Sequence, residues 1–190
     1  MIWELLRAFF GIFVVMDSLG NLPIFYSFVK GWAVGKRTEM IKQTMYVAGA
    51  MLFLFMFFGD SILSFFMLDF SSFQIAGGII VLIFGIKQVI GLRLLEERVK
   101  TYKSAVVPLA TPLITGPATI TTIMIFVHQY GLWVTFLASL MNLYVAYFFL
   151  SRADRLHVIL GRQGSDALSK IMGLILTAIA VGFIRQGWGG

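Results

Sequence analysis

The residues most able to take part in chemistry lie in two short motifs that interrupt apolar sequence. The first, DSLGNLP, runs from Asp17 to Pro23, and the second, TPLITGP, runs from Thr111 to Pro117. Asp17 offers a carboxyl group that can bind an ammonium group or a cation, and the Ser, Thr and Asn side chains offer hydroxyl and amide partners. These residue types predict a site for a small polar ligand, although a helix-capping role for Asp17 also fits the motif.

Composition places both motifs in a membrane protein. Of the 190 residues, 59% are hydrophobic and 13% are charged, and the mean hydropathy is +0.90. A spanning helix needs about 20 mostly apolar residues to cross about 30 Å of hydrocarbon. The chain has no cysteine, which excludes disulfides, thiol chemistry and cysteine-ligated metal sites.

Six apolar stretches predict an all-α polytopic membrane protein with six transmembrane helices. The first stretch is interpreted as a retained span, because it lacks a clear basic n-region and a small-residue cleavage site. The longest connection is expected over residues 151–170. The predicted spans are residues 3–28, 45–66, 73–90, 104–127, 132–150 and 171–184, and the last of them is expected to begin nearer Ala167.

The basic residues predict the orientation of these spans. All Lys and Arg residues except Arg7 and Arg185 lie in or beside the three connections that follow odd-numbered spans. By the positive-inside rule, these loops are cytoplasmic and both termini lie outside. Orientation in a cell membrane thus accounts for the net charge of +6, and we expect the lipid bilayer, not a nucleic acid, as the partner of this charge.

Sequence similarity between the two halves predicts an internal duplication. A shift of 94 residues aligns DSLGNLP with TPLITGP, and a shift of 96 aligns QIAGGIIVLI, residues 74–83, with KIMGLILTAI, residues 170–179. We therefore predict two three-helix repeats, residues 1–95 and 96–190, within one membrane domain. Because each repeat has an odd number of spans, the second enters the membrane from the opposite face, as in inverted-repeat transporters.

Prolines predict breaks near mid-membrane in helices 1 and 4. A proline inside a helix lacks the N–H that would pair with the carbonyl four residues earlier. Pro23 and Pro117 therefore predict discontinuous helices, with Pro112 as a further break, although simple proline kinks are the alternative. Unpaired backbone groups are tolerated at this depth only where they are buried in protein or line a polar cavity. Two breaks at equivalent places thus predict a shared polar centre.

The predicted centre combines groups of opposite polarity. Half-helix N-termini attract a carboxylate, while freed carbonyls and Asp17 attract an ammonium group or a cation, so a small zwitterion satisfies both. A carboxyl group at mid-membrane costs about 2.5 to 3.5 kcal/mol on insertion scales and is usually functional. The predicted substrate-binding residues are Asp17, Ser18, Leu19, Gly20, Asn21, Thr111, Leu113, Ile114, Thr115, Gly116 and Thr119.

These motifs resemble those of the MarC family of integral membrane proteins. The resemblance covers essentially the whole chain, through DSLGNLPIF, QIAGGIIVLIFGI and VPLATPLITGPATI. The family includes archaeal small neutral amino acid transporters. The resemblance therefore implies a secondary transporter of glycine, alanine, serine and similar amino acids, coupled to H⁺ or Na⁺. We expect alternating access around the two discontinuous helices, with Asp17 holding the substrate amine or taking part in coupling.

Other function classes fit less well. An ion or small-solute channel is the alternative, because broken helices also build selectivity filters. We expect no enzyme, since no nucleophile, base and orienting residue recur together in any span. His128 and His157 are predicted at opposite membrane faces, so they cannot share a metal, and neither a metal nor a cofactor is expected.

Several small and polar residues within the spans have structural interpretations. Gly77, Gly78 and Gly85 are expected to allow close helix packing. Gln74 and Asn142 can either contact substrate or only join helices, and for Asn142 we favour an interhelical hydrogen bond. Faces of small residues also permit a homo-oligomer without requiring one.

Overall fold

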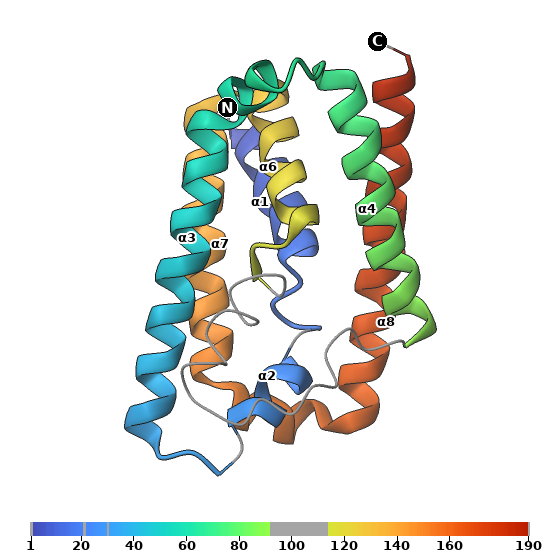
Figure 1. The fold of residues 1–190 in the computed structure, drawn as a ribbon. Coiled ribbons are helices and arrows are strands. Elements are labelled where there is room, and N and C mark those ends of the chain that lie inside the picture. Colours follow the sequence, from blue (N-terminus) through green and yellow to red (C-terminus); the bar gives the residue numbers. More distant parts are fainter. Residues whose placement is uncertain (1, 21, 30, 92–113, 190) are drawn as a thin grey trace.

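Helices account for most of the residues that the computed structural model describes, which are residues 2–20, 22–29, 31–91 and 114–189 (Figure 1). Within these residues there is no strand, as the sequence predicts. The helices are α1 (Ile2–Met16), α2 (Leu22–Val29), α3 (Val34–Phe65), α4 (Phe70–Ile90), α6 (Pro117–Tyr130), α7 (Leu132–Ser151) and α8 (Ala153–Trp188).

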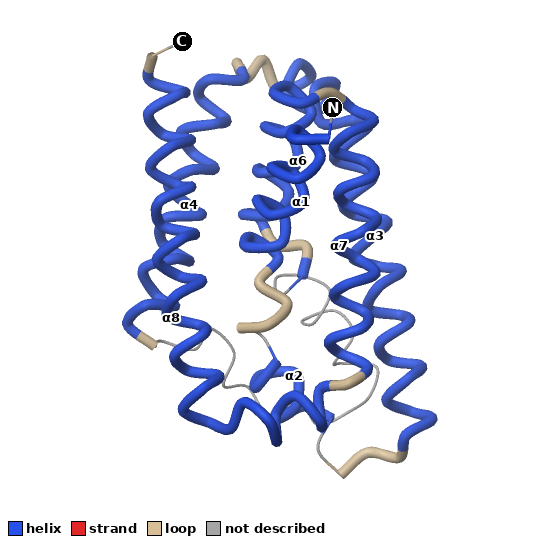
Figure 2. Tube along the Cα trace, turned by 180° about the vertical axis from the view of Figure 1, so that it is seen from behind, coloured by secondary structure: helices blue, strands red, loops and turns tan. Residues whose placement is uncertain are grey.

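The long helices form two pairs on either side of a central pair (Figure 1, Figure 2). α3 lies beside α7, α4 lies beside α8, and the shorter α1 and α6 lie between these pairs and stop near mid-height. Both termini lie at one end of the bundle, which we name the termini end, and α2 lies at the other. Lys36, Arg37, Arg152 and Arg155 lie in or beside the first turns of α3 and α8 at this second end, which we name the basic end.

Among the described residues, four helical segments are long and apolar enough to cross a membrane, namely Val34–Phe65, Phe70–Ile90, Leu132–Ser151 and Asp166–Trp188. α1 has 15 residues and α6 has 14. At about 1.5 Å per residue, both are only about 21–23 Å long, shorter than a hydrocarbon core of about 30 Å. The prediction of several apolar helices is confirmed. Six complete spans, two inverted repeats and the division at residue 95 stay predictions.

Two helices begin earlier than the sequence analysis predicts. α3 begins at Val34, not at residue 45, and α8 begins at Ala153, so the expected loop over residues 151–170 is wrong. Both segments are rich in charged residues, which is why they were expected to be loops. In α3, however, Met40, Ile41 and Thr44 follow helical spacing and form one buried stripe. In α8 the backbone leaves helical geometry at Gly161, with φ 62°, and the part before this kink runs across the basic end (Figure 1).

Arg37 connects three elements at the basic end. Its guanidinium group forms an ion pair with Asp154 in the first turn of α8. The Nη2 atom also donates to the carbonyl of Val29, the last residue of α2, over 3.3 Å. The short helix α2 is therefore attached to the start of α3, which in turn is attached to the start of α8.

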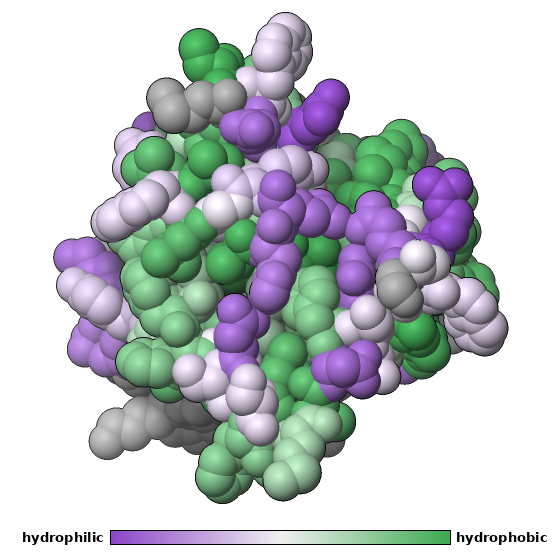
Figure 3. All heavy atoms as spheres, turned by 90° about the horizontal axis from the view of Figure 1, so that it is seen from above, coloured by the Kyte–Doolittle hydropathy of each residue, from purple (hydrophilic) through white to green (hydrophobic). Residues whose placement is uncertain are grey.

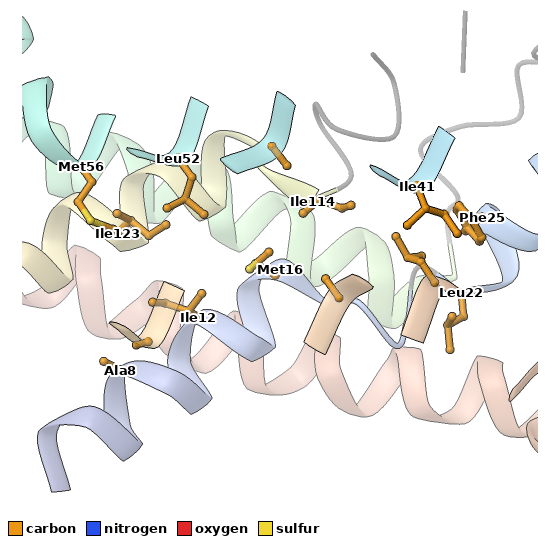
Figure 4. Packing of buried hydrophobic residues seen from close by; sticks show 14 of the residues in the cluster. Ala8, Ile12, Met16, Leu22, Phe25, Ile41, Leu52, Met56, Ile114 and Ile123 are labelled. Atoms are coloured by element: carbon orange, nitrogen blue, oxygen red, sulfur yellow. The ribbon is translucent and has the colours of Figure 1, made fainter. Parts of the chain in front are cut away.

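The central core joins α1, α3 and α6. Figure 4 shows Ile12 and Met16 of α1 in one cluster with Leu52 of α3 and with Ile114 and Ile123 from the α6 segment. All of these side chains are almost fully buried. Because lipid is as apolar as these side chains, tight van der Waals packing, not exclusion from water, holds such helices together.

The outer faces of the long helices are apolar as well. Phe57 of α3, Leu137 of α7 and Val181 of α8 are about half exposed, between 51% and 52%. Contiguous apolar surface of this kind needs a cover, which a bilayer supplies. Figure 3, which views the termini end, shows hydrophilic residues crossing a face that is otherwise largely hydrophobic.

Glycines bring α4 and α8 into close contact. A Cβ atom added at Gly85 would lie 2.9 Å from backbone atoms of Gly173 and Thr177, which leaves no space for a side chain. Gly78 likewise faces the backbone of α8, and Gly77 faces a threonine of α6. The prediction that these glycines serve helix packing is confirmed.

Candidate functional site

The first predicted motif lies at a break between α1 and α2. α1 ends at Met16, residues 17–20 form a turn, and α2 begins at Leu22. Asp17 has φ 43°, a left-handed conformation that is unfavourable for a residue with a side chain. Its N–H still donates to the carbonyl of Phe13 over 3.1 Å, so the chain departs from the helix directly after Asp17.

The Asp17 carboxyl group is buried and accepts hydrogen bonds on both oxygens. The residue is 7% exposed. The backbone N–H of Gly20 donates to Oδ1 over 3.1 Å, and Nε2 of Gln88, on α4, donates to Oδ2. A Cβ atom at Gly20 would collide with the carboxyl group, so a side chain at this position would displace the carboxyl group from its place in the turn. The end of α1 is thereby joined to α4 through a polar contact.

The described part of the second motif forms the start of α6. The helix begins with a proline, and its N-cap residue, Gly116, provides no side-chain cap. The Thr115 hydroxyl donates to the carbonyl of Ala48 on α3, and the Thr119 hydroxyl donates to the carbonyl of Ile114, each over 3.0 Å. The first N–H groups of α6 have no partner within the helix, as at any helix N-terminus. The two breaks lie near mid-height in the middle of the bundle (Figure 1).

The prolines of the two motifs lie where helices begin. Pro23 is the second residue of α2, and Pro117 is the first residue of α6. A helix tolerates proline in its first turn, because the missing N–H would have no helical partner there. The breaks therefore lie before the prolines, with residues 17–20 forming the described turn of the first motif.

The structure describes part of the predicted set of binding residues. Those that it places in the two breaks or in the first turn of α6 are buried, except Leu19, which is partly buried: Asp17, Ser18, Leu19, Gly20, Ile114, Thr115, Gly116 and Thr119. The predictions for Asn21, Thr111, Pro112 and Leu113 lie outside the described residues. Their contribution to a site stays a prediction.

Gln88 and Ser169 were not among the predicted site residues. Nε2 of Gln88 donates to the Ser169 hydroxyl of α8 over 3.2 Å as well as to Asp17. The only signal in the sequence is a polar residue in the apolar run FGIKQVIG, and nothing in that run identifies its partner.

Asn142 and Gln74, which by sequence could either contact substrate or join helices, join helices in the described structure. Nδ2 of Asn142, on α7, donates to the carbonyl of Phe9 on α1 over 3.0 Å. Nε2 of Gln74 donates to Oε1 of Gln186, on α8, over 3.1 Å. Nε2 of Gln129, on α6, donates to the same oxygen over 2.6 Å, so three helices meet in one polar contact near the termini end.

The histidines do not form a metal centre among the described residues. Nε2 of His128 lies 2.8 Å from Oδ1 of Asp60, close to the termini end. His157 lies in the part of α8 that crosses the basic end, so the two histidines are at opposite ends, as predicted. In the described part of the chain, no three His, Cys, Asp or Glu residues gather closely enough to hold a metal.

These apolar helices around a buried polar break define a polytopic helical membrane protein. Its family follows from comparison with known proteins: residues 2–190 match the model of the family described as MarC family integral membrane protein, and the chain belongs to that family. It is therefore an integral membrane protein.

The relatives are similar to this chain over almost their full length. One is a UPF0056 membrane protein of Methanocaldococcus jannaschii, 34% identical over 191 residues that cover 95% of this chain and 93% of the relative. Another is the UPF0056 inner membrane protein YhgN of Escherichia coli K12, 32% identical over 194 residues that cover 97% and 95%. No solved structure matches the chain.

Proposed function

We propose that this protein is a secondary transporter of small neutral amino acids such as glycine, alanine and serine. The observation that carries the proposal is the buried carboxyl group of Asp17 at a helix break, at the same height in the bundle as the start of α6. A buried carboxyl group inside a membrane protein is expensive, so its presence favours a role with a polar ligand or an ion.

The two breaks offer complementary partners for a zwitterion. The N-terminus of α6 carries partial positive charge and suits the carboxylate of an amino acid. Asp17 suits its ammonium group, or takes up the coupling H⁺ or Na⁺. Asn21, Thr111 and Leu113 complete the site in this proposal.

The proposed cycle uses the predicted six spans as two inverted repeats that move around this site. In this cycle the pair α4–α8 moves as one rigid unit, because at its glycines the two backbones lie too close together to leave space for a side chain. In the proposed orientation, the basic end faces the cytoplasm and both termini lie outside.

Flux measurements in proteoliposomes test this proposal. We expect saturable uptake of labelled glycine, exchange against unlabelled glycine inside, and dependence on an H⁺ or Na⁺ gradient. Large unitary currents without exchange would instead indicate a channel, and no flux of either kind would contradict the proposal.

Asp17→Asn is the most direct test of the site. The Asn amide keeps one accepting oxygen but replaces the other with an NH₂ donor, so it cannot accept from both Gly20 and Gln88, and it lacks the charge that pairs with ammonium. We expect uptake to fall about tenfold or more, because hydrogen bonds to charged groups contribute about 1.5–3 kcal/mol. Asp60→Asn, at an exposed aspartate near the termini end, is the matched control. Equal uptake by both variants would remove Asp17 from the mechanism.

A further inference from the structure

The Gln88 side chain supplies the only side-chain hydrogen-bond donor that the described residues bring to the Asp17 carboxyl group. Its amide nitrogen carries two N–H groups, and it contacts Oδ2 of Asp17 and, over 3.2 Å, the Ser169 hydroxyl. The remaining partner of the carboxyl group is the backbone N–H of Gly20, which belongs to the same turn.

An amide nitrogen and an ammonium group resemble each other as donors to a carboxylate, but differ in charge. Both direct N–H bonds at a carboxylate oxygen, whereas only the ammonium group forms a charge-assisted hydrogen bond, which is roughly twice as strong as a neutral one. A primary ammonium group can therefore replace the amide on Asp17.

The surroundings of Gln88 allow such a replacement. Its backbone is fixed, because Gly173 of α8 packs directly against its Cβ atom at the seam between α4 and α8. Its long side chain can turn away from Asp17 and still keep the Ser169 hydroxyl as a partner. Displacement therefore costs one hydrogen bond, while the amide nitrogen keeps its bond to Ser169.

We propose that the Gln88 amide occupies, on Asp17, the position that the ammonium group of a bound amino acid takes. This inference rests on the proposed transport function and adds a residue that determines specificity. Gln88 makes a ligand without an ammonium group unable to compete for Asp17. It also satisfies the buried carboxyl group when no ligand is bound, which allows the empty carrier to change conformation.

Binding of glycine to the purified full-length protein tests the proposal. Gln88→Met keeps the length and flexibility of the side chain but removes the competing N–H groups. We expect the variant to bind glycine about tenfold or more tightly than the unmodified protein, because binding no longer displaces a hydrogen bond from a charged group. Glycolate, which has the carboxylate without the ammonium group, should gain nothing. Gln74→Met is the matched control on the same helix, with its amide bonded to Gln186 instead.

The outcomes separate this inference from the proposed function. Unchanged or weaker glycine binding by Gln88→Met, while the unmodified protein binds glycine, overturns the inference alone, because a residue that contacts substrate or only positions Asp17 would weaken binding when removed. An equal gain for glycolate also overturns it. If the unmodified protein binds neither glycine, alanine nor serine, the proposed function fails, and the inference fails with it. Gln88→Ala provides a second variant should the methionine variant not fold.

A second measurement tests the proposed role of Gln88 in the conformational change of the empty carrier. In proteoliposomes, Gln88→Met should lower net glycine uptake relative to glycine exchange, because only net uptake requires the carrier to return empty with Asp17 unpaired. An unchanged ratio of net uptake to exchange would contradict this part of the proposal.

Discussion

The seam between α4 and α8 allows a stability prediction that is independent of any assumed ligand. Gly85→Ala adds one methyl group where a Cβ atom would lie 2.9 Å from the Gly173 carbonyl oxygen and from the Thr177 backbone nitrogen. Neither neighbour is the end of a flexible side chain, so the two helices must move apart. The Thr177 hydroxyl, which donates to the Gly173 carbonyl over 2.8 Å within α8, would contact the added Cβ atom as well.

Two opposing contributions determine how much Gly85→Ala changes the free energy of unfolding. Alanine is favoured over glycine inside a helix by about 0.5–1 kcal/mol. Overpacking a well-packed contact costs about 1–3 kcal/mol. We therefore expect Gly85→Ala to lower the free energy of unfolding by about 0–2.5 kcal/mol, and by about 1–3 kcal/mol relative to a variant that has only the helix-propensity gain.

Gly182→Ala is the matched control for this substitution. It lies within α8, and a Cβ atom added there meets no atom within 4 Å. Only the helix-propensity term applies, so this variant should be as stable as the unmodified protein or slightly more stable. Thermal unfolding of both variants in the same detergent compares them directly. If Gly85→Ala unfolds at the same temperature as Gly182→Ala, the close approach of α4 and α8 described above is incorrect.

Two further substitutions test the polar contacts. Asn142→Leu removes the side-chain donor of the Phe9 carbonyl and should lower the free energy of unfolding by about 0.5–1.5 kcal/mol, the usual contribution of an interhelical hydrogen bond in a membrane. Unfolding in detergent measures this change. An unchanged free energy of unfolding would mean that the bond contributes nothing to stability. Asp69 caps α4 by accepting the Ser72 N–H over 2.7 Å, and this bond holds the pKa of the Asp69 carboxyl group below its usual value. A group with a lowered folded-state pKa stabilises above its unfolded pKa, about 3.9, and this stabilisation is lost as the pH falls through the folded value. Asp69→Ala should therefore lower the melting temperature at pH 7, and the difference from the unmodified protein should shrink below about pH 4; a difference independent of pH would refute the cap.

Helix positions could be predicted from the sequence where apolar runs are uninterrupted. The predicted span over residues 132–150 nearly coincides with α7, Leu132–Ser151. The charged first turns of α3 and α8 were assigned to loops, because a hydropathy criterion discards helical residues that face water or headgroups. Amphipathic spacing at Met40, Ile41 and Thr44 was the signal that could have extended α3.

The candidate site was predictable only in part. Asp17 and Pro23 mark the first break because their residue types are costly in an apolar helix, which is a local property of the sequence. The partner of Asp17 is not a local property, since Gln88 lies 71 residues further along the chain. Only the tertiary arrangement of the helices brings Gln88 to the turn after α1, and neither periodicity nor composition contains that arrangement.

The placement of both termini at one end of the bundle has a consequence for how such chains can be joined. Two copies can be fused head to tail through a polar linker that never has to cross the bilayer, and reporter domains attached at either end emerge in the same compartment. Gene fusion of whole chains is thus topologically simple for this fold.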